Sequence, residues 1–221
     1  MAIDAAFLES NDGQAYVFKG DRMVCIKVVP STIHDKVIWG PKSLATGWKP
    51  LAKVGFTKVD AVLPVPNNKG HIWVFSGTQY ARIDMDKESV WFGPAPIAKH
   101  WPSLVKAGFT TVSAVFPTPG EPNHAYFFHK EQFARITLTP GKDEDTVYDG
   151  PAPLAKRWPA LEKAKFTTIN AVIPTPGFAN DGYFFCGEQY LRLTVTPDDN
   201  RDTVVFGPAP IQKHWTCLKD L

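Results

Sequence analysis

The chain has 221 residues, and its 24 Lys and Arg against 22 Asp and Glu leave a formal net charge of +2. So small a charge argues against general attraction to nucleic acid or to anionic membranes. Hydrophobic residues at 44%, charged residues at 21%, 20 Pro and 16 Gly are typical of a globular chain with many turns. The composition excludes a disordered protein and favours a turn-rich, all-β fold.

The sequence gives no sign of export or membrane insertion. Met1–Asp4 lacks the basic start and apolar run of a secretory signal, and no apolar segment approaches the ~18 residues that span a bilayer. The three Cys residues form no C-x-x-C pair, and no N-x-S/T acceptor site occurs. We therefore expect a soluble, cytoplasmic protein without a disulfide framework or zinc knuckle.

The sequence contains four copies of one repeat. Each copy is expected to open with a short strand, and the third residue of this opening phrase is always Ala. This phrase recurs at residues 3–6, 59–62, 112–115 and 169–172. An aromatic triplet follows at 16–18, 73–75, 126–128 and 183–185, and a third run follows at 22–26, 79–83, 132–136 and 189–193. Their β-branched and aromatic content, with Gly, Asn and Asp between the runs, predicts antiparallel strands joined by tight turns.

An outer strand, such as residues 90–92 or 204–206, and a short helix, such as residues 96–101, complete each unit. A Trp lies eight residues after a Gly-Pro pair in every copy, and successive Trp residues are 53, 57 and 57 positions apart. The four are Trp48, Trp101, Trp158 and Trp215. Helix-to-blade packing explains them better than a sugar-binding platform does.

A unit this small cannot bury two apolar faces alone, so neighbouring units must stack. The first copy starts near residue 1 and the last ends after its helix, which favours ring closure over a capped array. We predict one four-bladed propeller over residues 1–221, with blades at about 3–54, 55–108, 109–165 and 166–221. The repeated Ala is explained by crowding of the inner strands at the axis, or else by packing against a neighbouring blade.

These phrases together resemble haemopexin-like repeats, and the resemblance covers the whole chain. The form Gly-Pro-x-Pro-Ile/Leu-x-Lys-x-Trp, intact at 93–101, 150–158 and 207–215, is similar to the legume seed albumin-2 family; the first copy lacks its second Pro. No Cys stands at the start of blade one, so we expect the ring to close without the disulfide found in secreted relatives.

The resemblance implies a structural cation, calcium above all, on the propeller axis. Main-chain carbonyls of the four innermost strands would hold it, at Asp4, Asp60, Ser113 and Asn170. A second axial ion or water would lie further along the same strands, at Ala6, Val62, Val115 and Val172. Sodium and chloride are further candidates for the channel. The alternative is that small polar residues simply end a tight strand.

Polyamine, such as spermine, and haem are the organic ligands that the resemblance implies, and neither can be given a site. Three acidic clusters fall in hairpins where solvated charge is the ordinary expectation: 84–88, 143–145 and 198–202. Of the six His, His100 and His214 share the repeat position before Trp, and Gly47 and Arg157 replace them elsewhere, which indicates an exposed helix position. Arg82, Arg135 and Arg192 are expected to pack between blades and pair locally.

Enzyme motifs such as H-E-x-x-H, G-x-S-x-G and the phosphate-binding loop are absent. Our leading hypothesis is a non-enzymatic, seed-albumin-like protein that binds polyamine, haem or both, with a possible role in polyamine regulation or oxidative stress. A homodimer linked to ligand binding is expected by resemblance. Two alternatives stay open: a carbohydrate-binding haemagglutinin (a lectin), and a seed storage protein without a specific ligand.

Overall fold

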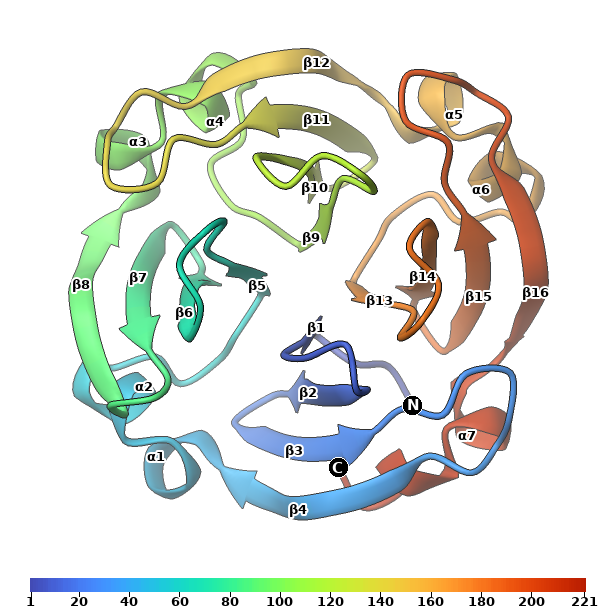
Figure 1. The fold of residues 1–221 in the computed structure, drawn as a ribbon, viewed down its shortest axis with the longest axis horizontal. Helices are drawn as coiled ribbons and strands as arrows, with labels where there is room; N and C mark the ends of the chain where they lie inside the picture. The colour runs from blue at the N-terminus through green and yellow to red at the C-terminus, as the bar shows by residue number, and fades with distance from the viewer.

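The computed structural model describes all 221 residues, and it contains four antiparallel sheets of four strands arranged around one axis (Figure 1). Blade 1 comprises β1 (Ala5–Leu8), β2 (Gln14–Lys19), β3 (Arg22–Lys27) and β4 (Lys36–Ser43). Blade 2 comprises β5 (Ala61–Pro64), β6 (His71–Ser76), β7 (Gln79–Asp84) and β8 (Ser89–Pro96). Blade 3 comprises β9 (Ala114–Pro117), β10 (His124–His129), β11 (Gln132–Thr137) and β12 (Thr146–Pro153). Blade 4 comprises β13 (Ala171–Pro174), β14 (Asp181–Cys186), β15 (Gln189–Thr194) and β16 (Thr203–Pro210).

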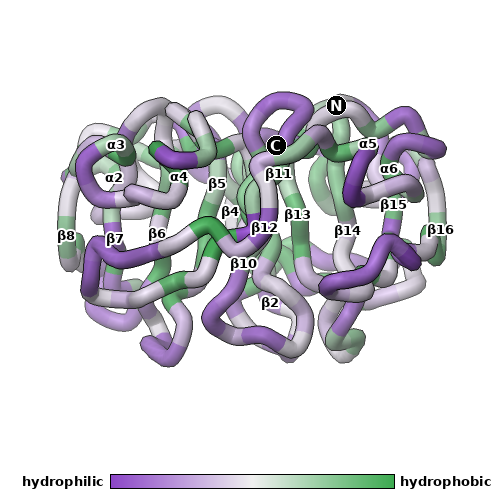
Figure 2. The backbone as a smooth tube through the Cα atoms, turned by 90° about the horizontal axis from the view of Figure 1, so that it is seen from above, coloured by the Kyte–Doolittle hydropathy of each residue, from purple (hydrophilic) through white to green (hydrophobic).

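The strands run in sequence order from the axis to the rim, and the predicted four-bladed propeller is confirmed. Because side chains alternate across a strand, a central strand contributes to two cores at once. Tyr126 and Phe128 of β10 enter the core between blades 3 and 4, whereas Phe127 enters the core between blades 2 and 3. Four apolar cores, one between each pair of neighbouring blades, hold the ring together, and hydrophilic residues gather in the loops at the two ends of the ring (Figure 2).

The repeated Ala packs between blades and does not point at the axis. Ala5 lies in the core shared by blades 1 and 2, and Ala61 lies in the core shared by blades 2 and 3. Side chains stand perpendicular to their sheet, so the inner strands present backbone edges, not side chains, to the axis. The axial-crowding interpretation is therefore wrong, and the packing alternative holds. The innermost strands also begin at this Ala, two residues later than predicted.

A pair of short helices, not one helix, follows each of the first three blades. They are α1 (Leu44–Gly47), α2 (Lys49–Lys53), α3 (Ile97–His100), α4 (Pro102–Lys106), α5 (Leu154–Arg157) and α6 (Pro159–Lys163). After blade 4, α7 (Ile211–His214) is followed by a 3-10 turn (Thr216–Leu218). The repeated Trp ends one helix and precedes the next, and a Pro in the first turn of the second helix suits that position.

The repeated Gly-Pro pair lies in the outer strand, where the register shifts opposite β3, β7, β11 and β15. The Gly150–Pro151 peptide bond is cis, as are its three equivalents. Gly150 has φ of +86°, and a Cβ there would lie 2.8 Å from the Phe133 carbonyl oxygen. Only glycine meets both conditions, which explains why it recurs.

Blades 1 and 4 close the ring noncovalently, and both termini lie close to this junction (Figure 1). The Met1 ammonium pairs with Glu188, and Lys19 Nζ donates to the Leu221 carbonyl over 3.0 Å. Ile3 and Leu221 enter the same apolar core. The three cysteines are free, as expected: Cys25, Cys186 and Cys217. No helix is long and apolar enough to cross a membrane.

Candidate ligand-binding site

Four residues predicted for the axial cation gather around a cavity of about 200 Å³, together with Lys58, Thr111 and Val112. They are Asp4, Asp60, Ser113 and Asn170. Three of their side chains have a structural task, because each accepts a hydrogen bond from the glycine of the adjacent hairpin turn: Asp4 from Gly20, Asp60 from Gly77 and Asn170 from Gly187, over 2.7, 2.6 and 2.7 Å.

The carbonyl oxygens of the same four residues accept no hydrogen bond from the chain. Each innermost strand pairs on one side only, so its other edge faces its counterparts across the axis. Crowded, unpaired carbonyls suit a hard cation that takes six to eight oxygens. No group of three or more His, Cys, Asp or Glu side chains converges as a metal site, so the chemistry of this donor set rests on the backbone.

Lys58 introduces a charge at this axial cavity that the sequence did not suggest. Its ammonium lies 3.0 Å from an Asp60 carboxylate oxygen, and that hydrogen bond raises the Lys58 pKa. Ala6, Val62, Val115 and Val172, predicted for a second axial ion or water, are buried in the innermost strands.

Two cavities of similar construction lie between blades, far from the axis. The 2/3 pocket, about 340 Å³, is lined by Trp73, Tyr80, Arg82, Trp91, Phe92, His100 and Trp101 of blade 2 and by Leu138, Thr139, Gly141, Lys142, Asp143 and Asp145 of blade 3. The 4/1 pocket, about 640 Å³, is lined by Tyr183, Tyr190, Arg192, Val205, Phe206, His214 and Trp215 of blade 4 and by residues 31–35 of blade 1. In each, one blade supplies an aromatic wall and the next supplies a hairpin.

The hairpin that closes each pocket carries a carboxylate at the same register. Asp35 and Asp145 each lie five residues after a proline, Pro30 and Pro140. Burial raises the pKa of Asp35 to about 6 and also raises the pKa of Asp145. Neither carboxylate pairs with a basic side chain: Asp35 accepts a hydrogen bond from the Val29 amide, and Asp145 accepts hydrogen bonds from Ser103.

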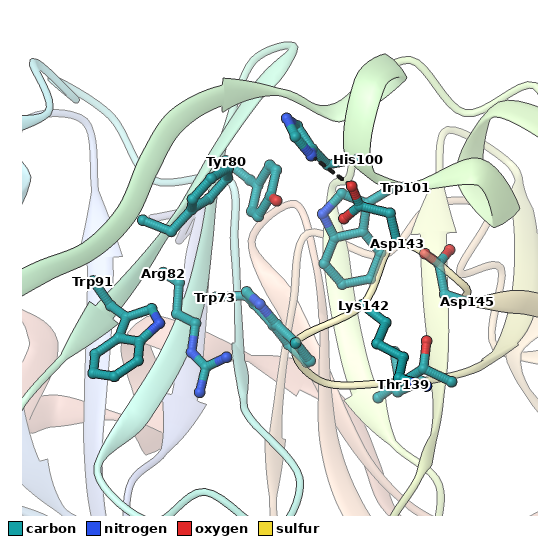
Figure 3. Close-up of a pocket in the computed structure, with 13 residues that line it drawn as sticks. Trp73, Tyr80, Arg82, Trp91, His100, Trp101, Thr139, Lys142, Asp143 and Asp145 are labelled. Carbon is teal, nitrogen blue, oxygen red and sulfur yellow. Dashed lines mark hydrogen bonds and ion pairs between the residues drawn. The ribbon is translucent and has the colours of Figure 1, made fainter.

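The 2/3 pocket has three tryptophans around a rim that is both acidic and basic (Figure 3). His100 Nδ1 lies 2.9 Å from Asp143, and the His100 ring lies beside the Tyr80 ring, with 6.1 Å between their centroids (Figure 3). Trp101 Nε1 and Thr139 Oγ1 are buried without a hydrogen-bond partner. This pocket therefore offers free donors and acceptors beside flat aromatic faces.

The 4/1 pocket is larger and has one carboxylate without a cation. Asp35 Oδ1 accepts only the Val29 amide hydrogen, over 2.7 Å. Arg192, the basic residue in the wall, is already engaged, because its Nη2 lies 2.7 Å from Asp181. Asp35 is thus the available charge in this pocket.

The residue before the repeated Trp is not an exposed helix position, so that interpretation is wrong. His100 and His214 are half-buried and line the pockets, and Arg157 at the third position is only 7% exposed. In all three cases the hairpin of the next blade lies against the side chain that precedes the Trp and shields it from solvent. The sequence of one repeat alone does not predict this burial, because the shielding hairpin belongs to the next repeat.

The acidic hairpins are also less solvated than expected. Asp84, Asp145 and Asp202 are buried, whereas Glu144 remains exposed. The repeated arginines pack as predicted: Arg135 pairs with Glu121 and with Asp198, and Arg192 with Asp181, but Arg82 donates only to His71 Nδ1.

Sequence reasoning missed Asp35, because its hairpin contains a single acid and forms no cluster. The available signal was the register: Asp35, Asp145 and Asp202 all stand five residues after a hairpin proline. Comparing copies position by position, instead of searching for local charge density, would have found it.

Comparison with known proteins agrees with this architecture. Residues 59–105 match the haemopexin family model. Albumin-2 of Pisum sativum is 26% identical over 225 residues, covering 99% of this chain and 95% of the relative. A plant lectin with two metal binding sites from Cicer arietinum superimposes with a TM-score of 0.87 at 26% identity, covering 99% of this chain and 97% of that one. A haemopexin-fold protein from cow pea has a TM-score of 0.87 at 24% identity, covering 98% and 96%.

The molecule is thus a four-bladed propeller, and it shares its fold with the haemopexin-fold protein from cow pea. The chain is similar to a seed albumin, since its similarity to albumin-2 extends over nearly the full length of both chains. These relatives are named as albumins and a lectin, not as enzymes, which fits a non-enzymatic protein.

Proposed function

We propose that the protein is a non-enzymatic binder of organic polycations, with spermine as the representative ligand, and that the 4/1 pocket receives one charged end. The observation that carries this proposal is the half-buried Asp35 carboxylate, which has no basic partner inside an aromatic cavity of about 640 Å³. A carboxylate and aromatic faces are the two groups that stabilise an alkylammonium ion.

Calorimetric titration with spermine at about 0.15 M salt tests the proposal, since that ionic strength suppresses diffuse surface attraction. Asp35→Asn keeps the size of the side chain and removes its charge, so we expect at least a tenfold loss of affinity. Glu144→Gln is the matched control, because Glu144 is an exposed hairpin acid outside both pockets. Equal losses in the two variants, or no heat and no thermal protection in the wild type, would sink the proposal.

A lectin is the second candidate, and the 2/3 pocket is the feature that favours it. A sugar needs donors and acceptors next to an aromatic face, and Trp101 Nε1 is a buried donor without a partner in that wall. The similarity to a plant lectin supports the same idea. Trp101→Phe should weaken red-cell agglutination that a simple sugar reverses, whereas Trp158→Phe, also unpartnered but outside the pocket, should not.

We also propose a structural cation on the axis, held by the free carbonyls of Asp4, Asp60, Ser113 and Asn170. Calcium suits these oxygen donors, and a bound ion would stabilise the ring without taking part in ligand chemistry. Thermal unfolding with added calcium and with chelator tests this role. An unchanged midpoint in both conditions would count against it.

Haem, dimerisation and a cytoplasmic location remain proposals that rest on resemblance. His34 and His214 both line the 4/1 pocket, and an altered Soret band that disappears in His214→Ala would support haem ligation by His214 there. Size-exclusion chromatography with and without spermine tests the link between ligand and dimer, and cell fractionation tests the location. A storage role without a ligand predicts that every titration is blank.

A further inference from the structure

Three of the four interfaces between blades receive the same hairpin aspartate, but only two of them are open. Asp145 reaches the 2/3 pocket and Asp35 reaches the 4/1 pocket, while Asp202 reaches the interface between blades 3 and 4. At that third interface Arg157 stands where the two open pockets have His100 and His214. The interface between blades 3 and 4 is therefore equivalent to the two open pockets, but the Arg157 side chain occupies it.

Arg157 is bound in this interface as a ligand would be. Its Nη1 lies 2.9 Å from Asp202, its Nη2 donates to the Thr196 carbonyl over 2.8 Å, and Nη2 lies 3.5 Å from the Tyr126 hydroxyl. The guanidinium carbon lies 5.1 Å from the centre of the Trp158 ring. The side chains of Arg157 and Asp202 are 8% and 0% exposed, so water does not screen this pairing.

The 4/1 pocket repeats the groups that hold Arg157. Asp35 replaces Asp202, and His214 stands at the position of Arg157. The remaining equivalents are the Val29 carbonyl for Thr196, Tyr183 for Tyr126 and Trp215 for Trp158. Because an imidazole is shorter than an arginine side chain, this receptor is left with a cavity in place of an occupant.

We propose that the 4/1 pocket binds the guanidinium end of a small alkylguanidine, in the place that Arg157 fills between blades 3 and 4. This inference rests on the proposed polycation function and adds the headgroup that the site prefers. A planar guanidinium can donate to a carboxylate and a carbonyl while it stacks on an indole, whereas a primary ammonium acts as a point charge.

The 2/3 pocket is a poorer match for a cation although it shares the register. Asp145 already accepts hydrogen bonds from the Ser103 amide and hydroxyl. Arg82 and Lys142 line the same cavity, and Arg82 has no carboxylate partner (Figure 3). Asp143, the second carboxylate of this pocket, lies 2.9 Å from His100 Nδ1. Both carboxylates therefore already have partners, and two basic groups stand beside them, which disfavours a further positive charge and confines the inference to the 4/1 pocket.

Two matched ligands test the headgroup. 4-Aminobutylguanidine and 1,4-diaminobutane differ only in one terminal group, and calorimetry should show the guanidine binding at least fivefold more tightly, at one site per chain. Equal affinities would overturn the guanidinium preference while leaving the polycation proposal intact if spermine still binds through Asp35. Failure of all three ligands would overturn both.

His214→Arg tests the location, because the new side chain should occupy the pocket as Arg157 does in its own interface. We expect at least a tenfold loss of aminobutylguanidine affinity with no loss of thermal stability. His100→Arg makes the same change in the 2/3 pocket and should bind like the wild type. Wild-type affinity in a folded His214→Arg variant would refute the location.

The reciprocal variant Arg157→His should open the third receptor and raise the number of guanidine sites from one to two. Circular dichroism establishes whether the variant is folded, and a folded variant that keeps one site contradicts the equivalence of the two interfaces. Should it fail to fold, the His214→Arg and His100→Arg pair decides the question alone.

Discussion

Replacing Arg157 by Met should destabilise the propeller strongly, because the change removes one half of a buried ion pair. The Asp202 side chain is 0% exposed and lies 2.9 Å from Arg157. Removing one partner of such a pair typically costs about 3–5 kcal/mol, most of which is the penalty of a buried carboxylate without compensation. Methionine keeps the apolar length of the side chain, so lost packing contributes little.

The double variant Arg157→Met with Asp202→Asn separates charge from packing. Without a charge to bury, it should recover at least about 1 kcal/mol relative to Arg157→Met alone. Urea unfolding at pH 8, followed by tryptophan fluorescence and by circular dichroism, measures both free energies of unfolding and tests for intermediates.

The pH dependence of the single variant provides an independent check. Burial already raises the pKa of Asp202, and without Arg157 it should rise further above its unfolded value. A raised carboxyl pKa contributes stability that is present at low pH and lost as pH rises through the folded pKa. The defect should therefore be smaller at pH 5 than at pH 8. A single-variant cost below about 1 kcal/mol, or a double variant no more stable than the single one, would refute the reasoning.

Three further outcomes follow from local geometry. Burial raises the pKa of Asp35 to about 6, so the protonated carboxyl stabilises the folded protein, and this contribution is lost as pH rises from about 4 to above 6. The thermal midpoint of Asp35→Asn should therefore depend less on pH than the wild-type midpoint does across that window. Identical pH profiles of the two midpoints would contradict the burial argument. Lys58→Met removes the ammonium at the axial cavity and should strengthen calcium binding about fivefold, the equivalent of ~1 kcal/mol of charge repulsion. The measurement is a larger calcium-induced rise in the thermal midpoint. An unchanged rise would argue against an axial ion next to this residue. Gly150→Ala should lower the free energy of unfolding by roughly 2 kcal/mol or more, because a Cβ would lie 2.8 Å from the Phe133 carbonyl oxygen. Gly120→Ala, at φ of +74° in open space, should show only the smaller conformational cost in the same urea assay. Equal costs in the two variants would exclude the close contact as the cause.

The ring could be predicted from the sequence because its determinants are local and repeated. Strand runs, Gly-Pro pairs and the Trp phrase recur at fixed offsets, and a unit with two apolar faces must stack. The direction of the repeated Ala side chains could not be predicted from the sequence, since it depends on how the sheets face one another around the axis. The second helix was missed because Trp101 ends one helix and Pro102 starts the next without a loop between them.

The ligand pocket escaped prediction for a different physical reason. It forms only where the aromatic wall of one blade meets the hairpin of the next, so no single repeat contains it. Asp35 and Trp215 lie at opposite ends of the chain, and their proximity follows from ring closure alone. Charge density along the sequence directed attention to residues 143–145, whereas the uncompensated carboxylate stands alone in the first hairpin.

The position of the 4/1 pocket at the junction of the first and last blades gives a bound ligand a mechanical consequence. Every other interface joins blades that are consecutive in the chain, but this one joins the first and last blades, so its contacts carry the largest loop-closure entropy cost. A molecule in this pocket would contact Asp35 of blade 1 and Trp215 of blade 4, and would so link the two blades across their interface. Its binding free energy would oppose separation of these two blades, so an occupied pocket would lengthen the lifetime of the closed ring against proteolysis.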